Sequence, residues 1–118
     1  MFDLRALDDE LNHLILTGKA MAAFEKFYAE DCVMQEPNAP ACVGKDANRK
    51  REQEVLDAVE AFHDAKLVAS AVGDGVSFSE WFMEVTMKGA GRVKMEQIAR
   101  RLWRDGKVVD ERFYYNRG

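Results

Sequence analysis

Two glutamates in this chain lie in settings where a carboxyl group can do chemistry. Glu36 stands directly before Pro37, and Glu111 lies within VVDERFYYN, residues 108–116, whose β-branched and aromatic residues are typical of a strand. A carboxyl group held in apolar surroundings has a raised pKa, which suits proton transfer next to a carbonyl. Each glutamate can instead be an ordinary solvated charge.

A third polar residue of interest, Gln97, lies in RVKMEQIARRLWR, residues 92–104. If this segment is a strand and Ala99 faces inward, Gln97 shares that face, and Arg101 lies on it toward the rim. Gln97 can then orient a substrate carbonyl or hydrogen-bond Glu111, and the two roles are compatible.

The other reactive residue types carry little chemistry. His13 and His63 have no metal-ligand partner at useful spacing, so no metal site is predicted. Cys32 and Cys42 are too few for a disulfide framework, and no neighbouring base makes Cys32 a nucleophile. The chain has no glycine-rich phosphate loop, and no cofactor is expected.

Composition and charge exclude several classes of protein. A chain of 118 residues that is 47% hydrophobic predicts one domain, residues 1–118, with one core. The net charge of −4 argues against a nucleic-acid binder. No apolar run reaches the ~18 residues of a membrane span, and the acidic start, MFDLRALDDE, is unlike a signal peptide. A cytoplasmic location is therefore expected.

Helical spacing dominates the first half of the chain. Leucines recur at steps of three and four over residues 2–16, and a short second helix follows at about residues 21–28. The segment CVMQE, residues 32–36, is typical of a short strand, and a loop with two prolines follows it. Asp46 is predicted to cap a third helix that runs to about Phe62. Its inward stripe is predicted to comprise Val55 or Leu56, Val59 and Phe62.

Four antiparallel strands are predicted after residue 64, separated by turns at residues 73–75, 89–91 and 105–106. In VSFSEWFMEVTMK, residues 76–88, one face is almost wholly apolar and is the better inward choice. That face comprises Trp81, Met83, Val85 and Met87. Phe78 and Phe82 then lie on the outer face as an association surface.

Three segments carry a resemblance to a known family. They are FYAEDCVMQEP (residues 27–37), Val43-Gly44-Lys45, and WRDGKVV (residues 103–109). With the order of elements, they make the chain resemble a SnoaL-like member of the nuclear transport factor 2-like superfamily. The resemblance implies an α+β cone of order α-α-β-α-β-β-β-β. In it a highly curved antiparallel sheet wraps around three N-terminal helices and encloses an apolar pocket.

The resemblance also bears on individual residues. Glu36 resembles the general base of ketosteroid isomerases, but the tyrosine and acid of their oxyanion hole correspond to Leu11 and Ala99, which cannot donate. The acid site of epoxide-hydrolysing relatives falls near Phe113. Taken with the strand alternation, the cone places Glu111 inward, paired with Gln97.

The resulting expectation is a protein that binds a small apolar molecule with a carbonyl, cyclic or open. It would catalyse acid/base chemistry of the isomerase, cyclase or dehydratase type, with Glu36 and Glu111 as candidate catalytic residues. The alternative is a non-catalytic ligand-binding or dimerisation module with a vestigial pocket. The residues expected to line the pocket are Met34, Trp81, Met95, Gln97, Phe113 and Tyr115.

A homodimer is the expected assembly, through the convex face of the sheet. An apolar centre with arginines around it is common in protein interfaces. The residues expected on that face are Ile98, Arg100, Leu102, Arg112 and Tyr114.

Overall fold

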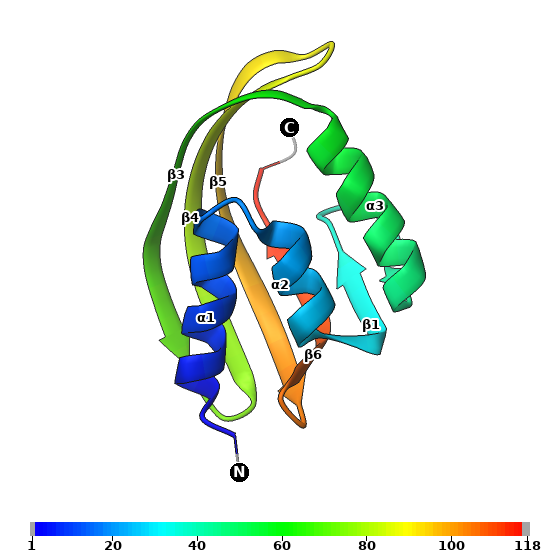
Figure 1. Ribbon diagram of the computed structural model, residues 1–118, viewed down its shortest axis with the longest axis vertical. Coiled ribbons are helices and arrows are strands. Elements are labelled where there is room, and N and C mark those ends of the chain that lie inside the picture. Colours follow the sequence, from blue (N-terminus) through cyan, green and yellow to red (C-terminus); the bar gives the residue numbers. More distant parts are fainter. Residues whose placement is uncertain (1, 117–118) are drawn as a thin grey trace.

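Residues 2–116, the part of the chain that the computed structural model describes, form a strongly curved sheet with three helices on its concave side (Figure 1). The helices are α1 (Leu4–Leu16), α2 (Ala20–Phe27) and α3 (Lys45–Asp57). The strands are β1 (Tyr28–Gln35), β2 (Cys42–Val43), β3 (Val59–Val72), β4 (Val76–Met87), β5 (Gly91–Arg104) and β6 (Lys107–Tyr114). The predicted α+β cone is therefore confirmed, with the two-residue β2 as an addition.

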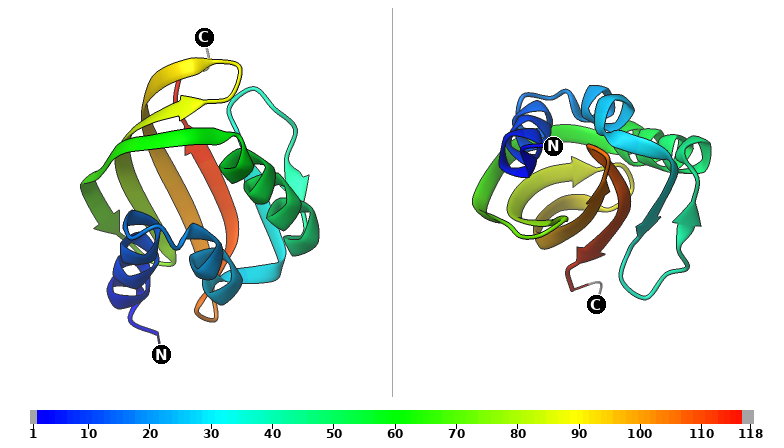
Figure 2. Two further views of the ribbon diagram at one scale, coloured as in Figure 1. Left: turned by 45° about the horizontal axis from the view of Figure 1, so that its top comes forward. Right: turned by 90° about the horizontal axis from the view of Figure 1, so that it is seen from below.

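The sheet has the strand order β2-β1-β6-β5-β4-β3. Strands β3 to β6 form the predicted antiparallel meander. β1 and β6 instead run parallel, with Met34 opposite Glu111, so the sheet is not wholly antiparallel. Both views in Figure 2 show the sheet bending, with the helices along its inner side.

Helix α1 forms where the leucine spacing predicts it. The Asp3 side chain caps its start by accepting a hydrogen bond from the Ala6 backbone, and Gly18, with φ of +78°, follows its end. Leu11 is fully buried, but Asp8 and Asn12 are equally buried. The inward face of α1 is therefore partly polar.

The third helix is shorter than predicted. It ends at Asp57, and the residues expected to extend it, Val59 to Phe62, belong to β3. Val59 pairs with Met87 and Phe62 with Val85 on β4, so pairing between distant segments overrides local helical spacing. The predicted inward stripe of the helix is also wrong, because Val55 and Leu56 are exposed.

The strand faces follow the predicted alternation. Trp81 and Val85 are buried on the inner face of β4, whereas Phe78 on its outer face is 43% exposed. The main apolar cluster lies where α1 and α2 cover β1 and β6. It comprises Leu11, Ala23, Phe24, Phe27, Tyr28, Cys32, Met34 and Val108. Within residues 2–116, no helix is long and apolar enough to cross a bilayer.

Candidate functional site

The side of α3 that packs on the sheet is polar. Lys45 and Asn48 are buried, and Arg51 and Glu52, one turn further along, are half-buried. These positions share one helix face because they recur at steps of three and four. A prediction based on an apolar stripe does not identify these residues, although their helical spacing is visible in the sequence.

Arg51 joins two glutamates into what we call the Glu36–Arg51–Glu52 cluster. Its Nη1 donates to Glu36 Oε1 at 3.2 Å, and its Nη2 donates to Glu52 Oε1 at 2.9 Å. Nη2 also lies 3.8 Å from Met34 Sδ, which places the cluster over the inner face of β1. Each of the three side chains is exposed by less than 30%.

Glu52 titrates in the neutral range. Burial is the main cause that raises its pKa to about 7, and the negative charges of Glu111 and Glu36 raise it further. The neighbouring Arg51 guanidinium opposes this shift. A carboxyl group with this pKa is present in both forms near pH 7, so it can give or take a proton.

The ion pair at the centre of the cluster leaves hydrogen-bonding capacity unused. Glu36 Oε2 and Arg51 Nε are buried and have no hydrogen-bond partner among the described residues. A buried polar atom in this condition costs about 1–3 kcal/mol. Such costs in a native structure call for a specific explanation, of which a catalytic role is one.

Glu111 lies on the inner face of β6, as the alternation indicates, and is 2% exposed. Its Oε1 accepts a hydrogen bond from the Tyr28 hydroxyl at 2.6 Å, and its Oε2 accepts one from Arg101 Nε at 2.8 Å. The predicted pairing with Gln97 is wrong, because the strand register places Arg101 opposite Glu111 and Gln97 opposite Trp81.

Arg101 is the centre of a buried polar network. Its Nη1 donates to Asp8 Oδ1 at 2.9 Å and to Asn12 Oδ1 at 2.8 Å, which ties β5 to α1. Ser77 also donates to Asp8, at 2.8 Å. With an exposed fraction of 1%, Arg101 is far from the rim position predicted for it. Strand alternation identifies the face on which Arg101 lies, but it does not show how far along β5 the helices cover that face.

Tyr28, the first residue of β1, completes this network. Burial, followed by the charge of Glu111, raises the pKa of the Tyr28 hydroxyl well above its ordinary value. The hydroxyl therefore stays protonated and donates to Glu111.

The residues expected to line the pocket divide into two groups. Met34 and Trp81 are buried in the core. Met95, Gln97, Phe113 and Tyr115 are half-buried. Met95 and Tyr115 line a hollow of about 230 Å³ together with Lys94, Glu96 and Asn116. Trp81 is therefore buried in the core, whereas Met95 lies at a hollow that residues of both faces of β5 line.

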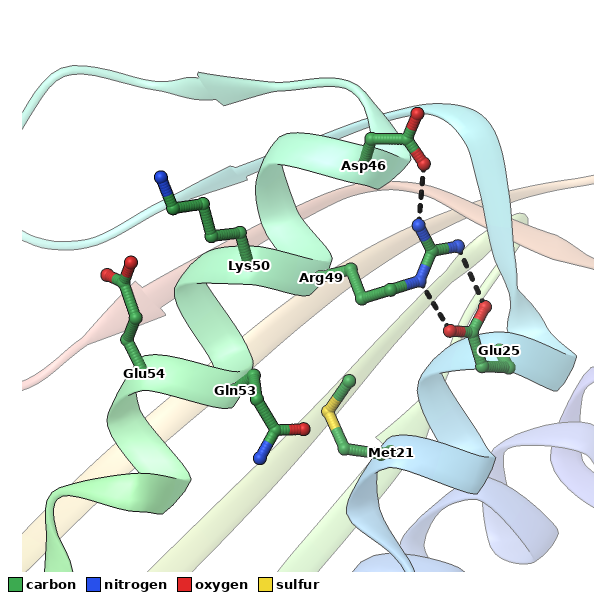
Figure 3. Close-up of a pocket in the computed structure, with 7 residues that line it drawn as sticks. All are labelled: Met21, Glu25, Asp46, Arg49, Lys50, Gln53 and Glu54. Carbon is green, nitrogen blue, oxygen red and sulfur yellow. Dashed lines mark hydrogen bonds and ion pairs between the residues drawn. The ribbon is translucent and has the colours of Figure 1, made fainter.

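A larger groove, of about 550 Å³, separates α2 from α3 on the outer side of the helices (Figure 3). Met21 and Gln53 point toward each other across it. At one end Arg49 donates two hydrogen bonds to Glu25 and one to Asp46. The Arg49 hydrogen bond lowers the pKa of Glu25. Neither this groove nor the smaller hollow is lined by Glu36, Glu52 or Glu111.

Two further positions bear on the chemistry. Leu11 and Ala99, the positions that the sequence resemblance predicts for oxyanion-hole donors, are 0% and 1% exposed and offer no donor side chain. Within residues 2–116, no group of three His, Cys, Asp or Glu side chains could hold a metal ion.

Comparisons with known proteins confirm the predicted resemblance. A family model described as a SnoaL-like domain matches residues 5–115. A candidate SnoaL-like polyketide cyclase from Mesorhizobium loti superposes with a TM-score of 0.89 at 26% identity, covering 97% of this chain and 100% of that chain. No curated protein gives a significant match.

Two more distant structures share the fold alone. A protein with a ketosteroid isomerase-like fold from Catenulispora acidiphila, in complex with trimethylamine, has a TM-score of 0.73 at 13% identity over 88% of this chain and 81% of that chain. AclR, a candidate hydroxylase from Streptomyces galilaeus, has a TM-score of 0.75 at 17% identity over 95% and 87% of the two chains.

Proposed function

This chain belongs to the SnoaL-like domain family, and we propose that its cone binds a small apolar molecule that carries a carbonyl group. On this molecule it performs cofactor-free acid/base chemistry of the isomerase, cyclase or dehydratase type. The observation that carries the proposal is the Glu36–Arg51–Glu52 cluster, which places two carboxyl groups around one guanidinium against the inner face of β1.

The two glutamates take different roles. Glu52, with its pKa raised to about 7, donates a proton to the carbonyl oxygen. Glu36, ion-paired with Arg51, takes the proton from the carbon between the carbonyl and a carbon–carbon double bond, and the unsaturated carbonyl compound becomes its dienol. Return of one proton from Glu36 to another carbon, and of the other from oxygen to Glu52, completes an isomerisation and restores both glutamates.

Turnover of a ligand found by screening tests this proposal. Cyclic ketones, lactones and polyketide-like phenols are screened by thermal shift, and hits are assayed for conversion. Loss of a general acid or base typically costs 10²- to 10⁴-fold in rate, so Glu52→Gln and Glu36→Gln are each expected to lower kcat by at least about 100-fold. The pH–rate profile of the wild-type protein should show a step near pH 7 that Glu52→Gln removes.

Glu54→Gln is the matched control, because Glu54 lies on the same helix but is exposed and lines the outer groove. It should turn over the hit at the wild-type rate. Wild-type rates in both Glu52→Gln and Glu36→Gln would refute the assignment.

A second candidate function is binding without catalysis. Leu11 and Ala99 favour it, because the positions that resemble the oxyanion donors of ketosteroid isomerases carry side chains that cannot donate. A hit that raises Tm and binds with a defined Kd, yet stays unchanged with wild-type protein, would support this second function.

The convex face of the sheet supports a homodimer as the assembly. Phe78, Ile98 and Tyr114 are between 41% and 48% exposed on its outer side, around the ion pair of Arg100 with Asp110. Gel filtration should give twice the mass of the 13.4 kDa chain. Ile98→Glu should give the monomer mass, whereas Val43→Glu, at an exposed position on β2, should leave the dimer intact. A wild-type monomer at micromolar concentration would refute this assembly.

A further inference from the structure

Glu111 lies beside the chemistry proposed above without taking part in it. Both of its carboxylate oxygens accept hydrogen bonds within the protein, and 2% of the residue is exposed. A general base must reach the proton that it removes. Glu111 does not meet this requirement.

We propose that Glu111 is a positioning residue, whose buried negative charge holds Glu52 in the protonated form that donates a proton. The inference rests on the proposed function for the role of Glu52. It adds a second cause of that protonation state, beside the burial of Glu52.

Two side chains, Met34 and Arg51, connect Glu111 with Glu52. Met34 on β1 is the register partner of Glu111 on β6. On its other side, Met34 Sδ lies 3.8 Å from Arg51 Nη2, and the same nitrogen donates to Glu52 Oε1 at 2.9 Å. Buried Met34 therefore lies between Glu111 and the Arg51–Glu52 pair. A charge acts more strongly through buried protein than through water, although the positive charge of Arg51 opposes the effect of Glu111 on Glu52.

The network around Glu111 carries more negative than positive charge. Arg101 forms ion pairs with both Asp8 and Glu111. Two carboxylates therefore share one guanidinium, and the fourth member, Tyr28, is a neutral hydroxyl that donates to Glu111. Of its members, Glu111 and Tyr28 belong to β6 and β1, and α3 packs on β1.

The charged and titratable groups that face Glu52 come from three elements. Arg51 on α3 favours its ionised form. Glu36 after β1 and Glu111 on β6 favour its neutral form. Tyr28 on β1 is in turn affected by the charge of Glu52. Arg51 forms ion pairs with Glu36 and Glu52. Glu111 instead pairs with Arg101.

Carboxyl-carbon NMR of the labelled full chain tests this directly. In Glu111→Gln the pKa of Glu52 should fall by about one unit, the lower end of the shifts that a charge at short range produces. At pH 7 the protonated fraction of Glu52 would then drop from about one half to about one tenth. A folded Glu111→Gln in which Glu52 titrates as in the wild type would overturn the proposal.

Asp110→Asn is the matched control. It removes an equal charge from the neighbouring position of β6, but Asp110 pairs with Arg100 on the opposite side of the sheet. The titration of Glu52 should be unchanged in this variant. An equal shift in both variants would show that net charge, rather than Glu111, sets the protonation of Glu52.

If Glu111→Gln fails to fold, the wild-type protein still decides the question. The Glu111 carboxyl carbon should shift in the step near pH 7 that belongs to Glu52, and the step should vanish in Glu52→Gln. A Glu111 signal without this step would overturn the coupling. These titrations need no ligand, so they are independent of whether Glu52→Gln affects turnover.

Discussion

Replacing Arg101 by methionine should destabilise this protein more than any surface charge substitution. The side chain is 1% exposed and donates to Glu111, Asp8 and Asn12. Methionine preserves much of the volume but leaves two buried carboxylates without a cation. Removing one partner of a buried ion pair costs about 3–5 kcal/mol. A domain of this size has about 5–15 kcal/mol of stability, so a large share would be lost.

Arg100→Met provides the matched comparison. Arg100 is the adjacent residue on β5 and also pairs with an acid of β6, Asp110, but both side chains are partly exposed on the outer face. Ion pairs of this kind contribute about 0–1 kcal/mol. Urea unfolding at pH 7 should therefore separate the two variants by at least about 2 kcal/mol.

The deficit of Arg101→Met should also depend on pH and on Glu111. Without the guanidinium, the buried acids bind protons more tightly when folded than when unfolded, so the deficit should shrink as the pH falls from 7 to 5. Adding Glu111→Gln should raise the stability of Arg101→Met although it lowers that of the wild type. If Arg101→Met unfolds within about 1 kcal/mol of Arg100→Met, the network is not the electrostatic centre described above.

Three other variants test separate parts of the structure. The pKa of Glu52 is raised in the folded protein from 4.5 to about 7, so its stabilising contribution is complete below pH 4.5 and lost as the pH rises through 7. The difference in unfolding free energy between wild type and Glu52→Gln should therefore change by up to about 3 kcal/mol across this window. A constant difference would contradict the raised pKa. Asn48→Ala should cost about 1–3 kcal/mol in urea unfolding and speed amide exchange in β2, because Asn48 donates to the carbonyls of Cys42 and Gly44. Unchanged exchange would mean that β2 is held by other contacts. Phe78→Glu should shift the gel-filtration mass to that of the monomer, and a retained dimer would exclude Phe78 from the interface.

Strand faces could be predicted from the sequence, but the pairs across strands could not. Alternation correctly placed Glu111 inward and Phe78 outward. The partner of Glu111 depends on how far β5 slides along β6, and the register puts Arg101 there rather than Gln97. Local sequence contains no information on this offset beyond the turn that joins the two strands.

One of the three residues of the Glu36–Arg51–Glu52 cluster could be predicted from the sequence. Glu36 was identified because proline follows it, but its partners Arg51 and Glu52 were not. Helix prediction assigns apolar residues to the inside, whereas α3 presents Asn48 and Glu52 to the sheet and leaves Leu56 exposed. Local patterning fails where a buried surface serves polar contacts, and such places are expected to be functional.

The parallel pairing of β1 with β6 has a consequence for how the protein is made. Tyr28 and Glu111 are 83 positions apart in the chain, and Asp8 and Arg101 are 93 apart. On the ribosome, the helices and β1 emerge long before the strand that pairs with β1 and the arginine that neutralises Asp8. The N-terminal half therefore cannot reach its final state during most of translation. A stalled chain that lacks β6 should be a substrate for chaperones rather than a smaller folded unit.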